Sequence, residues 1–142
     1  MEHEEYPQIY LYKRIVQAKL FIDNNYSKSI DLSNISNEAC FSVFHFIRLF
    51  KTTYGKTPRQ YLIKVRIDNS KLILVSGLSI AEVCEKVGFN SITTFSTLFK
   101  KMVGTTPLEF QKSCIKAAKS VASDPLLFVP ACFSQANGWV KK

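Results

Sequence analysis

A motif of eight residues occurs twice in this chain, and it constrains the fold more than any other feature. The first copy consists of Phe46, Leu49, Phe50, Lys51, Gly55, Thr57, Pro58 and Tyr61, and the second consists of Phe95, Leu98, Phe99, Lys100, Gly104, Thr106, Pro107 and Phe110. One common offset separates all eight pairs. Because regular self-similarity indicates a repeated structural unit, the sequence predicts two copies of one small unit.

Further pairs precede the motif at a slightly shorter offset. They are Leu32 with Ile80, Ile35 with Val83, Ala39 with Val87, and Phe41 with Phe89. The second copy therefore has one extra residue between the two sets of pairs. We place that residue in a turn, where a duplicated fold tolerates an insertion.

The stretch from Thr57 to Gly77 lies between the two copies, and its ends are typical of a helix. Thr57 is a favourable N-cap, and Pro58 suits the first helical position. Gly77 can end the helix in the left-handed conformation. We therefore predict one helix of about nineteen residues, or about 28 Å at 1.5 Å per residue, as a spacer between the units.

Each unit is predicted to contain two short helices joined by a tight turn, which is the helix-turn-helix pattern. The expected helices are Ile9–Asn25, Leu32–Ala39 capped by Asp31, Val43–Tyr54 capped by Ser42, Ile80–Val87 capped by Ser79, about Ser91–Val103, and a last one from Pro107 through Lys112. Cys40 to Ser42 and Gly88 form the turns. The fold class is therefore all-α.

The second helix of each unit has an apolar side and a side rich in basic and hydroxyl residues. We expect Phe46, Leu49 and Phe50 in the first unit, and Phe95, Leu98, Phe99 and Met102 in the second, to face inward. Helical geometry then turns another set outward. That set is Phe44, Ile47, Arg48 and Lys51 in the first unit, and Ile92, Thr93, Ser96, Thr97, Lys100 and Lys101 in the second.

The formal net charge of the 142 residues is +8, which favours an anionic partner. Nucleic acid is the usual partner of such a chain, an acidic membrane surface is less common, and an inert basic surface is the alternative. No apolar run approaches the roughly twenty residues of a membrane span. We therefore expect a soluble chain of one domain, or of two very small ones that share a spacer.

The four cysteines, Cys40, Cys84, Cys114 and Cys132, form no C-x-x-C pair and follow no secretory leader. We expect reduced thiols in a cytoplasmic protein. The residues His45, Cys40 and Cys84 do not have the spacing of zinc ligands. The sequence also contains no recognisable activated nucleophile, no phosphate-binding glycine loop and no paired carboxylates. The sequence therefore predicts no metal, no cofactor and no enzymatic activity.

The motif FK-x3-G-x-TP-x2-[YF] after each second helix resembles the DNA-binding domain of the AraC/XylS family of bacterial transcription regulators. The resemblance extends from about Ile9 to Lys112. It is most specific around Gly88-Phe89-Asn90, Phe99-Lys100-Lys101 and Thr106-Pro107, while Ser42, His45, Arg48, Phe50 and Lys51 match the first unit. It implies helix-turn-helix subdomains at 1–56 and 78–112, a linker helix at 57–77 and a C-terminal extension at 113–142.

The resemblance further implies a sequence-specific regulator of transcription whose two second helices enter successive major grooves of double-stranded DNA. The residues expected at the DNA are Ser42, Val43, Phe44, Ile47, Arg48, Lys51, Ser91, Ile92, Thr93, Ser96, Thr97, Lys100 and Lys101. Family members often have Arg or Gln where this chain has Ile47, Thr93 and Thr97. We therefore expect an A·T-leaning site, with base or phosphate contact by Arg48 and phosphate contacts by the lysines. Ordinary solvated side chains are the alternative for all four cations.

A second function class stays open, which is a protein-interaction module or co-regulator that contacts RNA polymerase or another regulator. The segment from about Ala122 repeats nothing earlier in the chain. It is expected either to pack on the globular part or to contact another chain, so the protein is a monomer or a weak dimer formed through this tail. A third hypothesis is that the protein is a regulator that lacks an effector domain and therefore acts constitutively.

Overall fold

The computed structural model describes residues 8–31, 33–35 and 42–123, and all regular structure in these ranges is α-helical, as predicted. The helices are α1 (Gln8–Asn25), α3 (Val43–Tyr54), α4 (Pro58–Leu74), α5 (Ile80–Lys86), α6 (Ile92–Val103) and α7 (Pro107–Ser123). Among the described residues, no helix is long and apolar enough to cross a bilayer.

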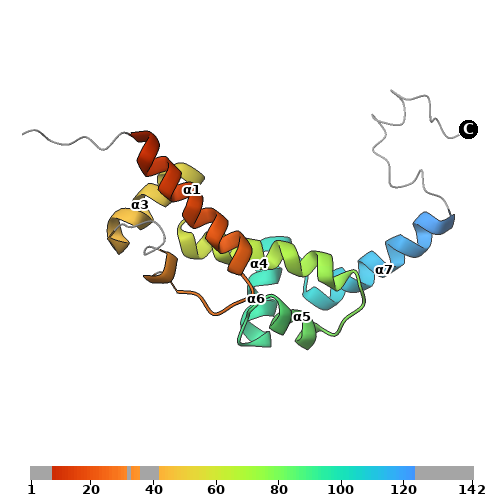
Figure 1. Ribbon diagram of the computed structural model, residues 1–142. Helices are drawn as coiled ribbons and strands as arrows, with labels where there is room; N and C mark the ends of the chain where they lie inside the picture. Colours follow the sequence, from red (N-terminus) through yellow and green to blue (C-terminus); the bar gives the residue numbers. More distant parts are fainter. Residues whose placement is uncertain (1–7, 32, 36–41, 124–142) are drawn as a thin grey trace, which may run out of the picture.

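The central helix of the molecule is α4, which contacts α1, α3, α5, α6 and α7. In Figure 1, α1 and α3 lie around the first half of α4, whereas α5 and α6 lie around its second half. The last helix, α7, extends away from the second unit. The predicted arrangement of two helical units on one linker helix is therefore confirmed.

The start of α4 agrees with the prediction, and Gly77 is left-handed as expected, with a φ of +86°, but the regular helix ends before this residue. The Thr57 hydroxyl accepts a hydrogen bond from the Gln60 N–H at 3.2 Å, and the Gln60 side chain accepts one from the Thr57 N–H at 3.0 Å. The helix ends at Leu74, before Gly77, because Ser76 binds the Ile73 carbonyl through both its amide and its hydroxyl. This tighter turn leaves 17 helical residues, or about 26 Å, instead of the expected nineteen.

Two other helix ends differ from the predictions. The short helix α5 ends at Lys86, and Val87 is its C-cap. The last helix continues beyond Lys112 to Ser123. The sequence from residue 113 to residue 123 contains no glycine or proline, and its alanines and lysines favour a helix, so nothing there ends α7.

The first helix of the first unit is described only in part. The Asp31 carboxylate accepts a hydrogen bond from the Asn34 N–H at 2.9 Å, as expected for an N-cap, and residues 33–35 are helical. Ile35 is buried. The predictions for Leu32, for the end of this helix at Ala39 and for the turn at Cys40 and Phe41 lie outside the described residues, as does the tail from residue 124.

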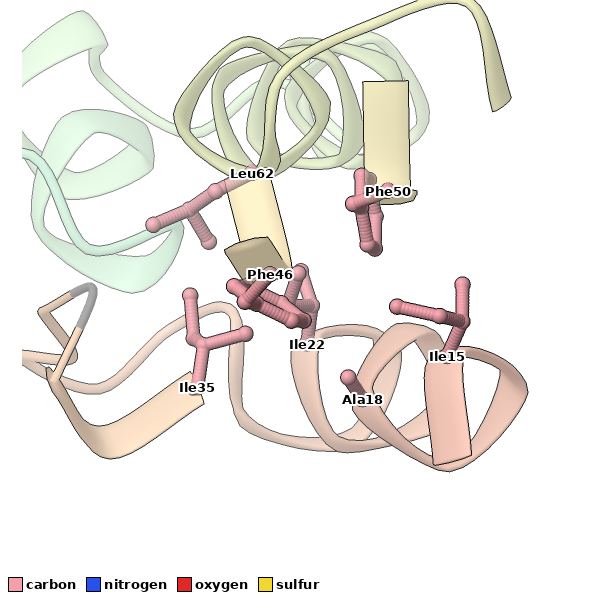
Figure 2. Close-up of a cluster of buried hydrophobic side chains, with 7 residues drawn as sticks. All are labelled: Ile15, Ala18, Ile22, Ile35, Phe46, Phe50 and Leu62. Atoms are coloured by element: carbon pink, nitrogen blue, oxygen red, sulfur yellow. The ribbon is translucent and has the colours of Figure 1, made fainter. Parts of the chain in front are cut away.

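Each unit has its own hydrophobic core. The first cluster consists of Ile15, Ala18, Ile22, Ile35, Phe46, Phe50 and Leu62, whose side chains point toward one another in Figure 2. The second consists of Ile67, Leu74, Val83, Cys84, Val87, Phe95 and Phe99. The linker helix contributes to both clusters, so burial of its two halves joins it to both units.

The repeated motif places equivalent aromatic rings in equivalent positions. The Phe50 and Tyr61 rings meet edge to face with 5.7 Å between centroids, and the Phe99 and Phe110 rings do so at 5.5 Å. In both units the helix after the threonine-proline pair therefore packs an aromatic ring on the preceding helix. The duplication inferred from sequence spacing is thus a duplication of structure.

Met102 does not face inward as expected, because its side chain is 44% exposed. The buried row of α6 follows Phe95 and Phe99 to Val103, which packs against the second cluster. Such an i, i+4, i+8 row rotates by about 40° at each step, because an α-helix has 3.6 residues per turn. By the last turn, the row has moved away from Met102.

Candidate nucleic-acid interface

Equivalent caps set the start and the end of α3 and α6. The Ser42 hydroxyl accepts a hydrogen bond from the His45 N–H, and the Ser91 hydroxyl accepts one from the Thr94 N–H. Gly55 and Gly104 end the two helices in the left-handed conformation. The two helices therefore have the same length and the same rotation relative to their cores.

The most exposed side of each helix contains four residues at equivalent positions. We define the outer face of α3 by Phe44, Arg48, Lys51 and Thr52, and the outer face of α6 by Thr93, Thr97, Lys100 and Lys101. All eight side chains are exposed. The Phe44 side chain is 80% exposed, which is unusual for a large apolar ring without a partner.

The remaining predicted residues lie at the edges of these faces. Ser42, Ser91 and Ile92 are exposed at the helix starts, whereas Val43, Ile47 and Ser96 are half-buried. Ile47 and Ser96 occupy equivalent positions, and both lie closer to the core than the outward assignment implied. They border the outer faces instead of lying at their centres.

Sequence reasoning missed three exposed positions, which are Thr52, Thr94 and His45, the equivalent of Thr94 in the first unit. Thr52 is four residues after Arg48 and is the equivalent of Lys101, so the repeat itself contained the signal. Thr94 follows Thr93 at the start of α6, beside a groove of about 660 Å³ between the two units. Residues of the first unit, such as Asp31 and Ser33, line the opposite wall of this groove.

The outer faces are positively charged. Neither α3 nor α6 contains an acidic residue. Within the described part of the chain, Arg48, Lys51, Lys100 and Lys101 form no salt bridge. Hydrogen bonds from Thr106 and the nearby charge of Lys100 lower the pKa of Glu109, the nearest acidic residue after α6. The four cations are therefore available to an anionic partner.

Two of the outer threonines use their hydroxyl groups inside the helix. Thr97 Oγ1 donates to the Thr93 carbonyl at 2.8 Å, and Thr52 Oγ1 donates to the Arg48 carbonyl at 2.9 Å. Since the hydroxyl proton is already bound, each side chain can present to a partner its methyl group and the acceptor side of its oxygen.

Cys84 and His45, the described side chains among those considered for metal binding or nucleophilic chemistry, are not grouped into a site. Cys84 is buried in the second core, its thiol donates to the Phe89 carbonyl at 3.6 Å, and burial raises its pKa. His45 is exposed on α3. Within residues 8–31, 33–35 and 42–123, no three His, Cys, Asp or Glu side chains are grouped as metal ligands would be. Cys40 lies outside these ranges.

A linker helix between two capped helix-turn-helix units with basic outer faces defines a double helix-turn-helix DNA-binding domain. Residues 35–113 match the model of a family described as a helix-turn-helix domain. The probable transcription factor PqrA of Proteus vulgaris is 32% identical over 88 residues, which cover 61% of this chain and 72% of that protein. The arabinose operon regulatory protein of Escherichia coli is 30% identical over 111 residues, which cover 77% of this chain and 38% of that protein.

Solved structures agree with these matches. The C-terminal domain of AraT, a response regulator from Geobacillus stearothermophilus, superposes with a TM-score of 0.67 and 26% identity, covering 70% of this chain and 84% of that one. The DNA-binding domain of AdpA, solved in complex with a target DNA, has the same fold with a TM-score of 0.67 and 23% identity. The match covers 78% of this chain and 96% of the AdpA chain. The chain therefore belongs to the AraC/XylS family and corresponds to its DNA-binding domain.

The chain accounts for only part of several relatives. It spans 64% of a regulator from Pseudoalteromonas carrageenovora, to which it is 33% identical over 107 residues, and 38% of the arabinose regulator.

Proposed function

We propose that this chain binds double-stranded DNA in a sequence-specific manner to regulate transcription, and that α3 and α6 are its two recognition helices. The subdomains would be residues 1–56 and 78–112, with the linker at 57–77 and an extension at 113–142. One observation supports this function best: the outer faces of α3 and α6 are equivalent, exposed and positively charged. The AdpA domain, which shares the fold, was solved with a target DNA.

The length of α4 supports docking in successive major grooves on one side of the duplex. Those grooves are about 34 Å apart. The 17 residues of α4 span about 26 Å, and α3 and α6 pack beside this helix instead of on its ends. The widths of the flanking units therefore provide the remaining separation. Because one chain supplies both helices, the two half-sites need not be symmetric.

The outer-face residues favour different kinds of contact. Arg48 is the only side chain among them that can donate two parallel hydrogen bonds to guanine. Lys51, Lys100 and Lys101 suit phosphates, because an ammonium group is a point charge. Phe44, Thr93 and Thr97 offer apolar contact to thymine methyl groups, which favours an A·T-leaning site. Ser42, Val43, Ile47, Ser91, Ile92 and Ser96 border these contacts.

This function is tested in two steps. Bound duplexes are first selected from a random library, and the selected duplex and a scrambled duplex are then titrated at one fixed salt concentration. We expect the selected duplex to contain two half-sites about one helical turn apart and to bind more tightly than the scrambled one by about 10³-fold or more. Equal affinity for the two duplexes would contradict sequence-specific binding.

A second candidate function, contact with RNA polymerase or another regulator, is favoured by an apolar stripe on α1. Ile9, Tyr12, Val16 and Leu20 recur at helical spacing and are each between 44% and 80% exposed. This stripe lies apart from the buried residues Ile15, Ala18 and Ile22 of the same helix. We expect Val16→Asp to reduce transcription from a promoter with the selected site while DNA affinity stays native. Unchanged transcription would contradict this second role.

A further inference from the structure

The connection that follows α1 belongs to the first unit but lies against the second. Gly88, in the turn of the second helix-turn-helix, has a φ of +94°. A Cβ atom at this position would lie 2.9 Å from the backbone oxygens of both Tyr26 and Ser27, closer than Cβ atoms approach backbone in proteins. The two units therefore touch backbone to backbone, and only glycine fits at the contact.

Arg66 of α4 binds the same connection from the side. Its Nε donates to the Tyr26 carbonyl at 2.7 Å, and its Nη2 donates to the Lys28 carbonyl at 3.0 Å. Its guanidinium carbon is 5.5 Å from the centroid of the Phe89 ring. Because the guanidinium is planar, it can hold two carbonyls and an aromatic face in one fixed arrangement.

These contacts extend to α6. The Phe89 and Phe95 rings lie 5.3 Å apart, and Phe95 is a fully buried residue in the first turns of α6. Tyr26 packs against both hydrophobic clusters. In addition to the backbone of the linker helix, direct contacts therefore connect the first unit to α6, through Gly88 and through the Arg66 side chain and Phe89.

We propose that the carbonyls of Tyr26 and Lys28, together with Arg66, Gly88 and Phe89, form a brace that fixes the orientation of α6 relative to α3. Arg66 is then a positioning residue for DNA recognition, which makes this inference rest on the proposed function. A linker helix alone can bend or rotate at its ends. A rigid brace limits the chain to half-sites at one spacing and raises the affinity for two half-sites on one duplex.

The orientation of the two units is measured without DNA by residual dipolar couplings of the backbone amides. In the native protein, we expect the couplings of both units to fit one common alignment tensor, because the units keep a fixed relative orientation. In Arg66→Ala, each unit should remain folded, but its couplings should require a separate alignment tensor. Lys71→Ala removes a positive charge from α4 outside the brace and should keep the common alignment.

If Arg66→Ala fails to fold, Arg66→Lys replaces it, because lysine keeps the charge but lacks the planar fork that binds two carbonyls. Separate alignments in the native protein would overturn the brace. So would a common alignment in the Arg66 variant.

Binding to duplexes with shifted half-sites gives the functional measurement. We expect the native protein to lose about tenfold or more in affinity when the selected spacing changes by two base pairs. In the Arg66 variant this loss should fall to about twofold, while its affinity for a duplex with a single half-site stays native. A native-like dependence on spacing in the variant would overturn the proposal. If the native protein does not distinguish two half-sites from one, the proposed function fails, and the alignment measurement still decides whether the brace exists.

Discussion

Arg48 lies exposed on α3 and is the only arginine on either outer face. Arg48→Ala should cost about 1–3 kcal/mol at the selected site and relax the preference at one base pair. Arg48→Lys should retain most of the affinity for scrambled DNA but lose that preference, because lysine does not form the bidentate pair. Titration of the selected duplex and its three variants at that base pair measures both effects. If both variants keep the native ratio of affinity for the selected duplex to affinity for the scrambled duplex, the proposed base contact of Arg48 is contradicted.

Thr97 should contact DNA through its methyl group, since its hydroxyl proton is bound to the Thr93 carbonyl. Thr97→Val keeps a methyl group there and should leave the affinity near native. Thr97→Ser removes it and should weaken binding by about 0.8 kcal/mol, the value of one buried methylene-sized group. Replacing the contacted thymine by uracil should have a similar effect on the native protein and none on Thr97→Ser. A loss with valine equal to the loss with serine would show that the hydroxyl makes the contact.

Lys100 is expected to neutralise a phosphate. Lys100→Ala should weaken binding to selected and scrambled duplexes alike and lower the slope of log K against log salt concentration by about one. The matched control is Lys71→Ala, which removes a lysine of α4 that lies 3.7 Å from the Asp68 carboxylate. The control should keep the native slope, and a native slope in Lys100→Ala would contradict the phosphate contact.

Most outward residues were predictable because a fixed offset identifies the core positions, and helical geometry then assigns the rest. Ile47, Ser96 and Met102 were placed less well. Helical periodicity gives the direction of a side chain but not the width of the core that it meets. The half-buried state of Ile47 and the exposure of Met102 depend on packing by neighbouring helices.

At the scale of the elements, the cap of α4 should contribute to the stability of the whole domain, because both cores include residues of this helix. Thr57→Ala removes the hydroxyl that accepts from the Gln60 N–H and should lower the free energy of unfolding by about 1 kcal/mol. Thr57→Ser keeps the cap and is the control. Urea unfolding followed by circular dichroism should show a lower midpoint for the alanine variant only. Equal midpoints would show that the capping box adds nothing.

Helix starts were easier to predict than helix ends. Ser42, Thr57 and Ser79 each cap the helix that the sequence assigned to them. Ser91, which was expected as the first residue of its helix, is the N-cap of α6. The end of α4 depends on Ser76, whose local hydrogen bonds compete with the helix before Gly77 is reached. The end of α7 was placed too early because the repeat stops near Lys112, although helix-forming residues continue to Ser123.

At the scale of the whole molecule, the repeat predicted two units and one linker but not how the units are held together. The hydrogen bonds of Arg66 join segments about forty residues apart, and the contact of Gly88 with the backbone of Tyr26 and Ser27 joins segments about sixty residues apart. Nothing in the spacing of the repeat connects these positions, since the connection after α1 lies outside the eight-residue motif. Such a link depends on the three-dimensional packing of the two units.

In the proposed complex, one chain places two recognition helices on one side of B-form DNA. Hydroxyl-radical footprinting of the native protein on the selected duplex tests it most directly. We expect protected backbone positions in clusters on one side of the duplex, with the two half-sites centred about 10 base pairs apart. A single cluster, or two clusters offset by about half a helical turn on opposite sides of the duplex, would contradict it.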